Sequence, residues 1–447
     1  MKIDFNYKLN EIIRLQNNLF GSGNDTVTPS AVVEKCLTDV DFNNTNIKLY
    51  DPACGHGAFI IGAIKKFFNS KCHQLKFPNT LQRMKHIIEK QIYGNDLQVK
   101  KTKVICSLID SLVPTVKINI ENYDFLSYNI DMRFDYITSN YPFKDPNKKK
   151  STGTMNIWPA FTEKCLGLLK DENSKLIPVV PGSWMKNSRD ILRAKDAGGS
   201  KNLFNDYMKQ KNLIYINIGE GEKYFKEGST FTWFVLENKP YEKKTKIDVA
   251  DKKNDFKISS GEIDISPLKS IRYADNFLEV SINAKAQDYS EFFSFSSHET
   301  YKRKPRSTKE DKNYRYPCLN YKIRPSLEKE KFDLVYLLEP HPLAKKKKIH
   351  VPYVGPTIPY VDRGRFGVVH GQVYLLKENE LVESAEDVMY SKLFKFLFSE
   401  NNGLHNESGV MNIYFKPDLS RRWTNEELYK EIGLTDEEIK FVEDFNY

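Results

Sequence analysis

The first 240 residues alternate between short apolar runs and amphipathic segments. Apolar residues recur at helical spacing over 6–20, and Thr28-Pro29 is expected to open a second helix with Thr28 as its N-cap. From residue 47 the pattern predicts strands at 47–50, 91–95, 117–123, 134–139, 174–180, 214–218 and 230–237, and helices at 58–68, 100–112 and 157–169. Such alternation predicts a doubly wound α/β fold with a mostly parallel sheet.

The pattern changes after about residue 240, where charged, aromatic and proline-rich stretches replace the regular alternation. We therefore expect a domain boundary near 245, with one domain over 1–245 and a second over 246–447. Two short helices are expected between Thr424 and Phe445, because Thr424 and Thr435 are each followed three residues later by a glutamate, as in a capping box.

The composition limits the class of protein. With 40% hydrophobic and 13% aromatic residues, the 447-residue chain can bury large cores. No apolar run approaches the roughly 20 residues that cross a bilayer, and no signal-peptide pattern is found, so we expect a cytoplasmic protein. The six cysteines form no Cys-x-x-Cys pair and the eight histidines show no metal-ligand spacing, so no metal site is expected.

Charge is distributed unevenly. The formal net charge is +9 over the whole chain, and the segments 1–240, 241–375 and 376–447 carry +9, +8 and −8. Two basic blocks favour a polyanionic partner, although a lysine-rich composition without functional meaning would give the same count.

Residues 51–59, Asp-Pro-Ala-Cys-Gly-His-Gly-Ala-Phe, form a glycine-rich turn between a predicted strand and a predicted helix. Gly55 and Gly57 would let the backbone approach a ligand closely. Ile60 stands where a dinucleotide-binding loop has its third glycine, and no phosphate-loop Gly-Lys-Ser/Thr follows. The turn therefore favours a ligand that is not held by phosphates.

Three further groups follow predicted strands, at the edge where doubly wound folds bind ligands. Asp96 could accept from ribose hydroxyls, and Asp124-Phe125 could bind a purine, although each also fits an ordinary strand-end or turn residue. The third group, Asn140-Tyr141-Pro142-Phe143, combines a side-chain amide, a proline and an aromatic ring.

Together these motifs resemble the gamma-class DNA adenine-N6 methyltransferases over most of residues 25–240. The resemblance implies a Rossmann-like α/β fold with a mixed seven-stranded sheet, S-adenosylmethionine as the cofactor, and a C-terminal α+β domain that recognises the DNA target. It implies catalytic roles for Asn140, Tyr141, Pro142 and Phe143. It implies cofactor contacts from Thr28, Asp51, Pro52, Ala53, Cys54, Gly55, Gly57, Phe59, Asp96, Asp124 and Phe125. The sequence departs from the family where Tyr141 replaces a proline and where 70–90 resembles a surface insertion.

The reaction that the resemblance implies is attack by adenine N6 on the cofactor's methyl group. Asn140 Oδ1 and the carbonyl of residue 141 would accept the two amino protons, and Phe143 would stack on a base flipped out of duplex DNA. Candidate DNA contacts are Lys148 and Lys149 after the catalytic motif and, in the second domain, Lys302, Arg303, Lys304, Arg306, Lys345–Lys348, Arg363 and Arg365.

Three alternatives remain open from the sequence. A methyltransferase with the same motif could act on RNA adenine or on a protein glutamine. The chain could be a catalytically inactive DNA-binding relative, with Tyr141 marking the lost activity. A fused restriction-modification enzyme is disfavoured because no nuclease motif is found, although a separate cognate restriction endonuclease could be a partner.

Overall fold

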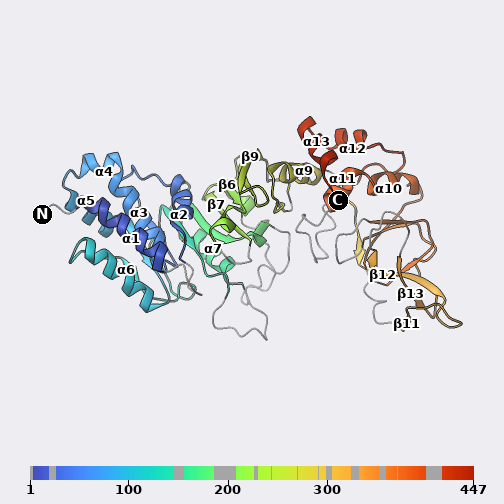
Figure 1. Ribbon diagram of the computed structural model, residues 1–447, viewed down its shortest axis with the longest axis horizontal. Helices are drawn as coiled ribbons and strands as arrows, with labels where there is room; N and C mark the ends of the chain where they lie inside the picture. Colours follow the sequence, from blue (N-terminus) through green and yellow to red (C-terminus); the bar gives the residue numbers. More distant parts are fainter. Residues whose placement is uncertain are drawn as a thin grey trace. The chain divides into compact units, whose positions relative to one another are not determined.

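The computed structural model describes residues 4–19, 27–144, 156–185, 208–225, 230–242, 244–268, 270–289, 291–297, 305–323, 332–351, 359–369, 371–398 and 415–446. The chain forms two compact units (Figure 1). Unit 1 comprises 1–184 with 189–266, and unit 2 comprises 185–188 with 267–447. The first unit thus continues about twenty residues past the boundary expected at 245, because two further strands extend its sheet.

A nine-stranded sheet organises unit 1, in the order β3-β2-β1-β4-β5-β7-β6-β8-β9. The strands from β3 to β5 pair in parallel, and β7 lies antiparallel between β5 and β6. Their bounds are β1 Leu49–Asp51, β2 Ile92–Asn95, β3 Ile120–Glu121, β4 Tyr136–Asn140, β5 Lys175–Pro181, β6 Asn212–Ile218, β7 Phe231–Glu237, β8 Thr245–Asp251 and β9 Lys257–Ile263.

The expected α/β fold is confirmed, but the expected count of seven strands is wrong. The seven strands anticipated from the sequence form one end of the sheet, and the hairpin β8–β9 adds two more through the parallel pairing of β6 with β8. Sequence patterning missed this hairpin because 245–263 is rich in charged residues, so its apolar alternation is weak.

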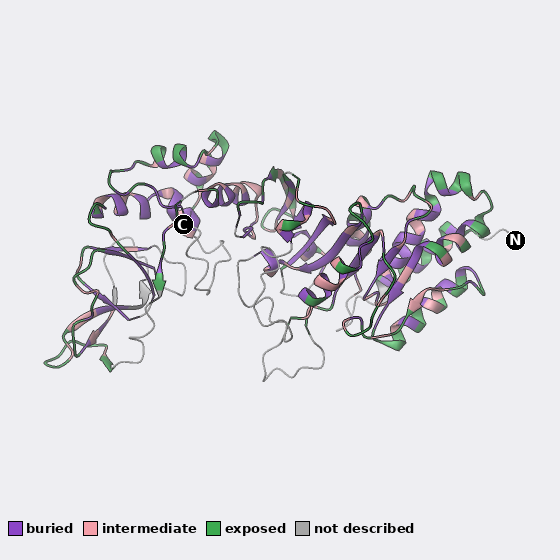
Figure 2. Ribbon diagram, turned by 180° about the vertical axis from the view of Figure 1, so that it is seen from behind, coloured by how far each residue is buried: buried purple, intermediate pink, exposed green. Residues whose placement is uncertain are grey.

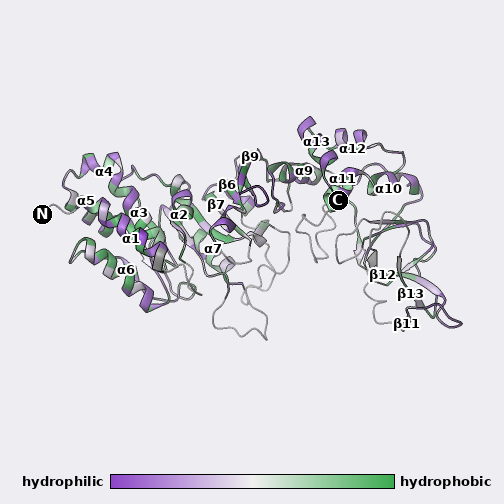
Figure 3. Cartoon of the chain, in the orientation of Figure 1, coloured by the Kyte–Doolittle hydropathy of each residue, from purple (hydrophilic) through white to green (hydrophobic). Residues whose placement is uncertain are grey.

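Helices connect the parallel strands of unit 1. The helices are α1 Phe5–Leu19, α2 Ser30–Cys36, α3 Ala58–Asn69, α6 Val99–Leu112 and α7 Trp158–Gly167. The strand order runs outward from β1 to β3 and then returns to β4, so right-handed connections place α3 and α6 on one face and α7 on the other. Hydrophobic and hydrophilic residues alternate along α1 and α6, as expected for helices that cover a sheet (Figure 3).

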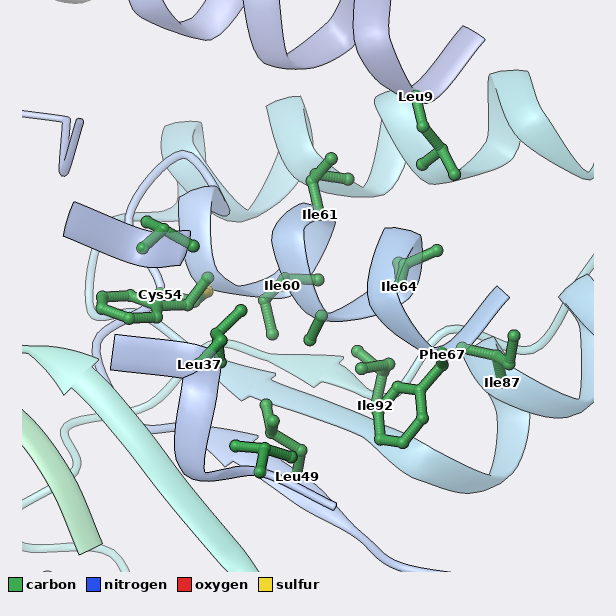
Figure 4. Close-up of a cluster of buried hydrophobic side chains, with 14 of the residues drawn as sticks. Leu9, Leu37, Leu49, Cys54, Ile60, Ile61, Ile64, Phe67, Ile87 and Ile92 are labelled. Carbon is green, nitrogen blue, oxygen red and sulfur yellow. The ribbon is translucent and has the colours of Figure 1, made fainter. Parts of the chain in front are cut away.

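The core of unit 1 lies on both faces of the sheet. On one face Leu9, Leu49, Ile60, Ile64 and Phe67 belong to one buried cluster that joins α1, α3 and the sheet (Figure 4). The next residue along β1 after Leu49 is Tyr50, which points to the opposite face and stacks on Phe134 with ring centroids 4.3 Å apart. The strands are accordingly mostly buried, whereas helices expose their outer sides (Figure 2).

Residues 70–90, expected to be a surface insertion, fold into α4 Lys71–Lys76, α5 Thr80–His86 and the π-helical segment Ile87–Gln91. The insertion has buried polar contacts of its own. His73 Nε2 and Gln91 Oε1 are 2.6 Å apart, and the guanidinium of Arg83 donates to the carbonyl of Phe68 at the end of α3. Its exposed residues are therefore held by an internal polar framework.

Unit 2 combines two four-stranded sheets with helices. One sheet has the order β10-β17-β14-β15 and the other β11-β13-β12-β16. The strands are β10 Ser296–Ser297, β11 Arg306–Ser307, β12 Tyr316–Ile323, β13 Phe332–Leu337, β14 Lys348–Val351, β15 Tyr360–Asp362, β16 Gly367–Val368 and β17 Gln372–Leu375. The helices are α9 Phe277–Gln287, α10 Val382–Met389, α11 Lys392–Phe398, α12 Asn425–Glu431 and α13 Asp436–Asp444.

The two C-terminal helices form as expected. Thr424 and Glu427 make a complete capping box at the start of α12, and Thr435 and Glu438 make another at α13. Their apolar residues pack into the main cluster of unit 2. No helix in the described ranges has both the length and the apolar character that crossing a bilayer requires.

Candidate active site

The loop after β1 is built around two glycines in the left-handed region. Gly55 has φ +53° and Gly57 has φ +83°, and the Gly57 N–H donates to the carbonyl of Cys54 at 2.7 Å, which closes a tight turn into α3. A Cβ on Gly57 would lie 2.0 Å from Ile105 Cδ1, so a side chain is excluded by space as well as by conformation. Phe59 and Cys54 are buried and anchor the loop to the core.

Asp51, the last residue of β1, carries a buried carboxyl group without a cationic partner. It is 1% exposed, and its Oδ1 accepts from the Ala53 N–H at 3.2 Å. Burial raises the pKa of Asp51 to about 7, against the lowering by the Ser139 hydroxyl and the Ala53 amide, and the nearby Asp96 raises it further. No lysine, arginine or histidine among the described residues forms an ion pair with it, so a cationic ligand fits this position.

Asp96 holds the glycine loop against the end of β2. Its Oδ2 accepts from the Gly55 N–H at 2.9 Å, and its Oδ1 accepts from the Gln98 N–H at 2.8 Å. It is 9% exposed. The expected contact between Asp96 and a ribose stays a prediction. The structure adds that Asp96 holds the glycine loop that follows Asp51.

Asn95, which the sequence analysis did not single out, ties three segments of this edge together. Its amide donates to the carbonyls of Pro52 and Tyr123, and its Oδ1 accepts from the Tyr123 N–H at 3.0 Å. The carbonyl of Asn95 accepts from the Cys54 N–H at 2.8 Å. Asn95, which is only 1% exposed, thus positions the loops after β1, β2 and β3.

The expected purine-binding pair divides between surface and core. Asp124 is exposed and accepts from the Leu126 N–H at 3.0 Å. The ring of Phe125 is 2% exposed and lies against Phe161, with centroids 4.9 Å apart, and Lys164 Nζ lies 5.1 Å from its centroid. Phe125 is therefore a core residue that supports the loop after β3, which leaves little of its ring for a ligand.

Asn140 ends β4 at the carboxyl edge of the sheet, next to β1 and its glycine loop. Its Nδ2 donates to Thr28 Oγ1 at 3.1 Å. The expectation that Thr28 caps α2 is wrong, because the N-cap is Pro29 and no side chain bonds the helix start. Thr28 is 6% exposed and joins the catalytic motif instead. This contact leaves Asn140 Oδ1 available as an acceptor.

The side chain of Tyr141, the residue that departs from the family pattern, points into the core. It is 2% exposed, its ring centroid lies 5.4 Å from that of Phe161, and its hydroxyl lies beside the Cys165 thiol. Burial raises the pKa of Tyr141 well above its ordinary value, so the phenol stays neutral. The tyrosine side chain therefore fills space between β4 and α7.

Phe143 is half-buried at the end of an aromatic row. Its ring centroid is 5.6 Å from that of Phe231, which stacks on Phe225 at 4.4 Å. Pro142, between the two aromatic residues of the motif, is exposed. Phe231 begins β7, so residues almost 90 positions apart in the sequence support the ring that would contact a flipped base.

A second missed residue is Gln16 in α1. Its Nε2 donates to the carbonyl of His56, inside the glycine loop, at 2.7 Å, and it is 4% exposed. Gln16 continues the buried stripe formed by Leu9 and Ile12. A polar residue at an apolar position of an amphipathic helix is the signal that could have identified it.

The candidate DNA contacts differ in whether the structure describes them and in whether their side chains are exposed. Lys148, Lys149, Lys302, Arg303 and Lys304 lie outside the described residues. Arg306 and Arg365 are exposed, and so are Lys345, Lys346 and Lys347. Lys348 is wrong as a surface contact, since its side chain is 0% exposed and pairs with Asp362. Arg363 is bound by Glu383 and Glu386.

Within the described ranges, no group of three or more histidine, cysteine, aspartate or glutamate side chains is arranged to hold a metal ion.

Comparison with known proteins finds similarity in the N-terminal part of the chain. A family model described as N-6 DNA Methylase matches residues 13–165. The type II methyltransferase M.VspI of Vibrio sp. (strain 343) is 28% identical over 129 residues, which cover 28% of this chain and 27% of that protein. Residues 13–165 are thus similar to the N-6 DNA methylase family, and this similarity implies S-adenosylmethionine as the cofactor.

Solved structures give lower similarity. A modification subunit assigned to a type I restriction enzyme from Vibrio vulnificus YJ016 aligns with a TM-score of 0.42 at 16% identity, covering 56% of this chain and 53% of that one. A type I restriction-modification methyltransferase subunit from Streptococcus thermophilus aligns at 0.34 and 13%, covering 49% and 45%. The chain spans about a quarter of the curated relative and about half of these structures.

Proposed function

We propose that this chain, whose residues 13–165 match the N-6 DNA methylase family, transfers a methyl group from S-adenosylmethionine to adenine N6 in duplex DNA. The observation that carries the proposal is the placement of Asn140 and Phe143 at the sheet edge that also holds Asp51, the Gly55–Gly57 turn and Asp96. Unit 2 would choose the DNA sequence.

The residues present fit the cofactor that the family implies. The left-handed glycine turn lets a ligand approach the backbone, and the unpaired buried carboxyl of Asp51 suits a cationic molecule. Asp51, Gly55, Gly57 and Asp96 would hold the cofactor. When bound, S-adenosylmethionine supplies an electrophilic methyl group on a positively charged sulfur.

The catalytic task of the chain is to make the adenine amino group a better nucleophile. Its lone pair is delocalised into the ring, so acceptors that hold both amino protons favour the pyramidal nitrogen of the transition state. Asn140 Oδ1 would accept one proton and the carbonyl of Tyr141 the other. The replacement of proline by tyrosine at 141 preserves that carbonyl, and its side chain lies in the core. These two facts favour an active enzyme over an inactive relative.

The target base must leave the duplex before it can reach Asn140. Flipping costs a few kcal/mol, and stacking on an aromatic ring offsets about 1–3 kcal/mol. Phe143, supported by Phe231, would provide that ring.

The direct test supplies the protein with S-adenosylmethionine carrying a labelled methyl group and duplex DNA of mixed sequence, followed by digestion to nucleosides. The expected product is labelled N6-methyl-2′-deoxyadenosine from the DNA. Asn140→Ala should abolish transfer while cofactor affinity stays within about twofold. Asn69→Ala, which removes an exposed amide at the far end of α3, serves as the control. Label found only in RNA or protein, or no transfer despite cofactor binding, would overturn the proposal.

A further inference from the structure

Two loops of unit 2 lie against each other backbone to backbone. One loop, 343–347, leads into β14, and the other, 363–366, follows β15; the two strands pair with Lys348 opposite Asp362. Gly364 has φ +95°, and a Cβ there would lie 3.1 Å from the carbonyl oxygen of Lys345. The close approach requires glycine at 364.

A buried ion pair holds both loops. The side chains of Lys348 and Asp362 are fully buried and in contact. Lys348 Nζ also donates to the carbonyls of Leu343 and Lys346 at 2.9 and 3.0 Å, so all three ammonium protons are used inside the first loop and the pair. Asp362 accepts three backbone N–H groups from the second loop, those of Gly364, Arg365 and Phe366, at 2.7–3.1 Å. One pair therefore sets the conformation of both loops.

The first loop presents Lys345, Lys346 and Lys347, which we name the lysine platform. All three are exposed. Lys347 lies close enough to Glu383 to contribute to the lowered pKa of that carboxyl group, behind the larger effect of Arg363. The acidic residues nearest the second loop are engaged elsewhere, because Arg363 bonds Glu383 at 2.7 Å and Glu386 at 2.6 Å. The structure thus fixes the backbone under three consecutive cations, and Arg363 bonds both neighbouring carboxylates and balances one of their two charges.

We infer that the lysine platform binds the phosphate backbone of the DNA substrate. The inference rests on the proposed function and assigns one of its DNA contacts. Lysine ammonium groups act as point charges that position phosphates and do not discriminate bases. A backbone fixed from within lets the three side chains face a phosphate strand without first ordering the loop. Arg363, expected from the sequence to bind DNA, has an intramolecular role instead.

The test compares two double variants of the full chain. Lys345→Ala/Lys346→Ala removes two platform charges, and Lys430→Ala/Lys440→Ala removes two exposed charges from α12 and α13 of the same unit. Binding of a fluorescent 30-base-pair duplex is measured by anisotropy over a series of salt concentrations. Each lost phosphate contact lowers the slope of log affinity against log salt by about 0.9, so the platform variant should lose roughly 2 in slope and the control nothing.

The outcomes separate this inference from the proposed function. Equal slopes for the two variants, with wild-type protein that binds and methylates DNA, would overturn the platform and leave the methyltransferase proposal standing. A wild-type protein that binds DNA with the expected slope difference but transfers no methyl group would support the platform and overturn the proposed function. Absence of DNA binding by the wild type would overturn both.

A separate observation concerns Thr28. The structure assigns it as a positioning residue for Asn140, because its hydroxyl is the hydrogen-bond partner of Asn140 Nδ2 and it does not cap α2. An amide side chain can rotate by half a turn and exchange its oxygen and nitrogen. The hydrogen bond to Thr28 holds the plane of the Asn140 amide, and in the structure Nδ2 faces Thr28 while Oδ1 remains for the adenine amino group.

Three variants test this role. Thr28→Val keeps the shape and removes the hydroxyl, whereas Thr28→Ser keeps the hydroxyl. Thr102→Val, at a buried threonine of equal 6% exposure in α6, is the control. Thr28→Val should lower kcat by roughly tenfold with little change in S-adenosylmethionine Kd, and Thr28→Ser should restore most of it. A variant that instead weakens cofactor binding at unchanged kcat, or a serine that fails to restore kcat, would overturn the assignment.

Discussion

Each unit of the molecule buries an aspartate at the end of a three-residue strand, and the two carboxyl groups are treated in opposite ways. Asp362 ends β15 with a lysine and three backbone N–H groups as partners. Asp51 ends β1 with one backbone N–H and no cation, and burial raises its pKa to about 7. An aspartate at the end of a strand thus stabilises the fold where another residue of the protein balances its charge. Where the protein supplies no counter-charge, the aspartate can serve as a ligand site.

The largest effect is expected from removing the charge of Asp362. Asp362→Asn leaves Lys348 buried without a counter-charge, which should lower the free energy of unfolding of unit 2 by about 3–5 kcal/mol. The double variant Lys348→Met/Asp362→Asn should be less destabilised than the single one. Urea denaturation followed by circular dichroism measures both. A single variant within about 1 kcal/mol of wild type would contradict the assignment of this pair as a structural element.

The same substitution at Asp51 should have the opposite sign. The pKa of Asp51 is about 7 in the folded chain and its ordinary value is 3.8, so between these pH values the folded state retains a proton that the unfolded state has lost. Stability therefore falls as pH rises through this window, by at most about 4 kcal/mol. Asp51→Asn removes this dependence, so its advantage over wild type should be greatest at pH 8 and vanish toward pH 4. Denaturation across pH is the measurement, and a variant less stable than wild type at pH 8 would refute the reasoning.

The smallest effect concerns ligand binding. A cationic cofactor favours the ionised form of Asp51, so the affinity for S-adenosylmethionine should increase as pH rises through 7, by at most about tenfold per unit below the pKa. Isothermal titration calorimetry between pH 6 and 8 would show it. The Asp51→Asn variant should bind more weakly and with a flat profile; an equally steep profile in that variant would place the titrating group elsewhere.

Much of unit 1 could be predicted from the sequence because its signals are local. The strand and helix bounds around the glycine turn follow from apolar periodicity and from Gly55 and Gly57, as the match of α3 to its expected range shows. The hairpin β8–β9 could not be predicted in this way. Its pairing with β6 is a long-range contact, and its charged residues hide the alternation.

The same difference between local signals and long-range contacts applies to the residues of the candidate site. The roles proposed for Asn140 and Phe143 rest on four adjacent residues, because the chemistry of an amide beside an aromatic ring is visible in the sequence. Gln16 and Asn95 were missed, since their role is to hydrogen-bond backbone carbonyls of other segments. The burial of Phe125 could not be predicted, because sequence does not reveal which side of a loop faces the core.

The amino-acid sequence by itself determined the fold class, the glycine turn and the residues of the proposed catalytic motif, since each depends on residues close together in the chain. Only the tertiary structure decided what the polar groups of those segments contact. It buried the side chain of Tyr141 in the core. It made Thr28 the hydrogen-bond partner of Asn140, where the sequence predicted a helix cap. It also buried the side chain of Lys348 and left Lys345 exposed. The physical reason is that burial and hydrogen-bond partners depend on segments far apart in the sequence, and these set both the charge a group carries and the task it can perform.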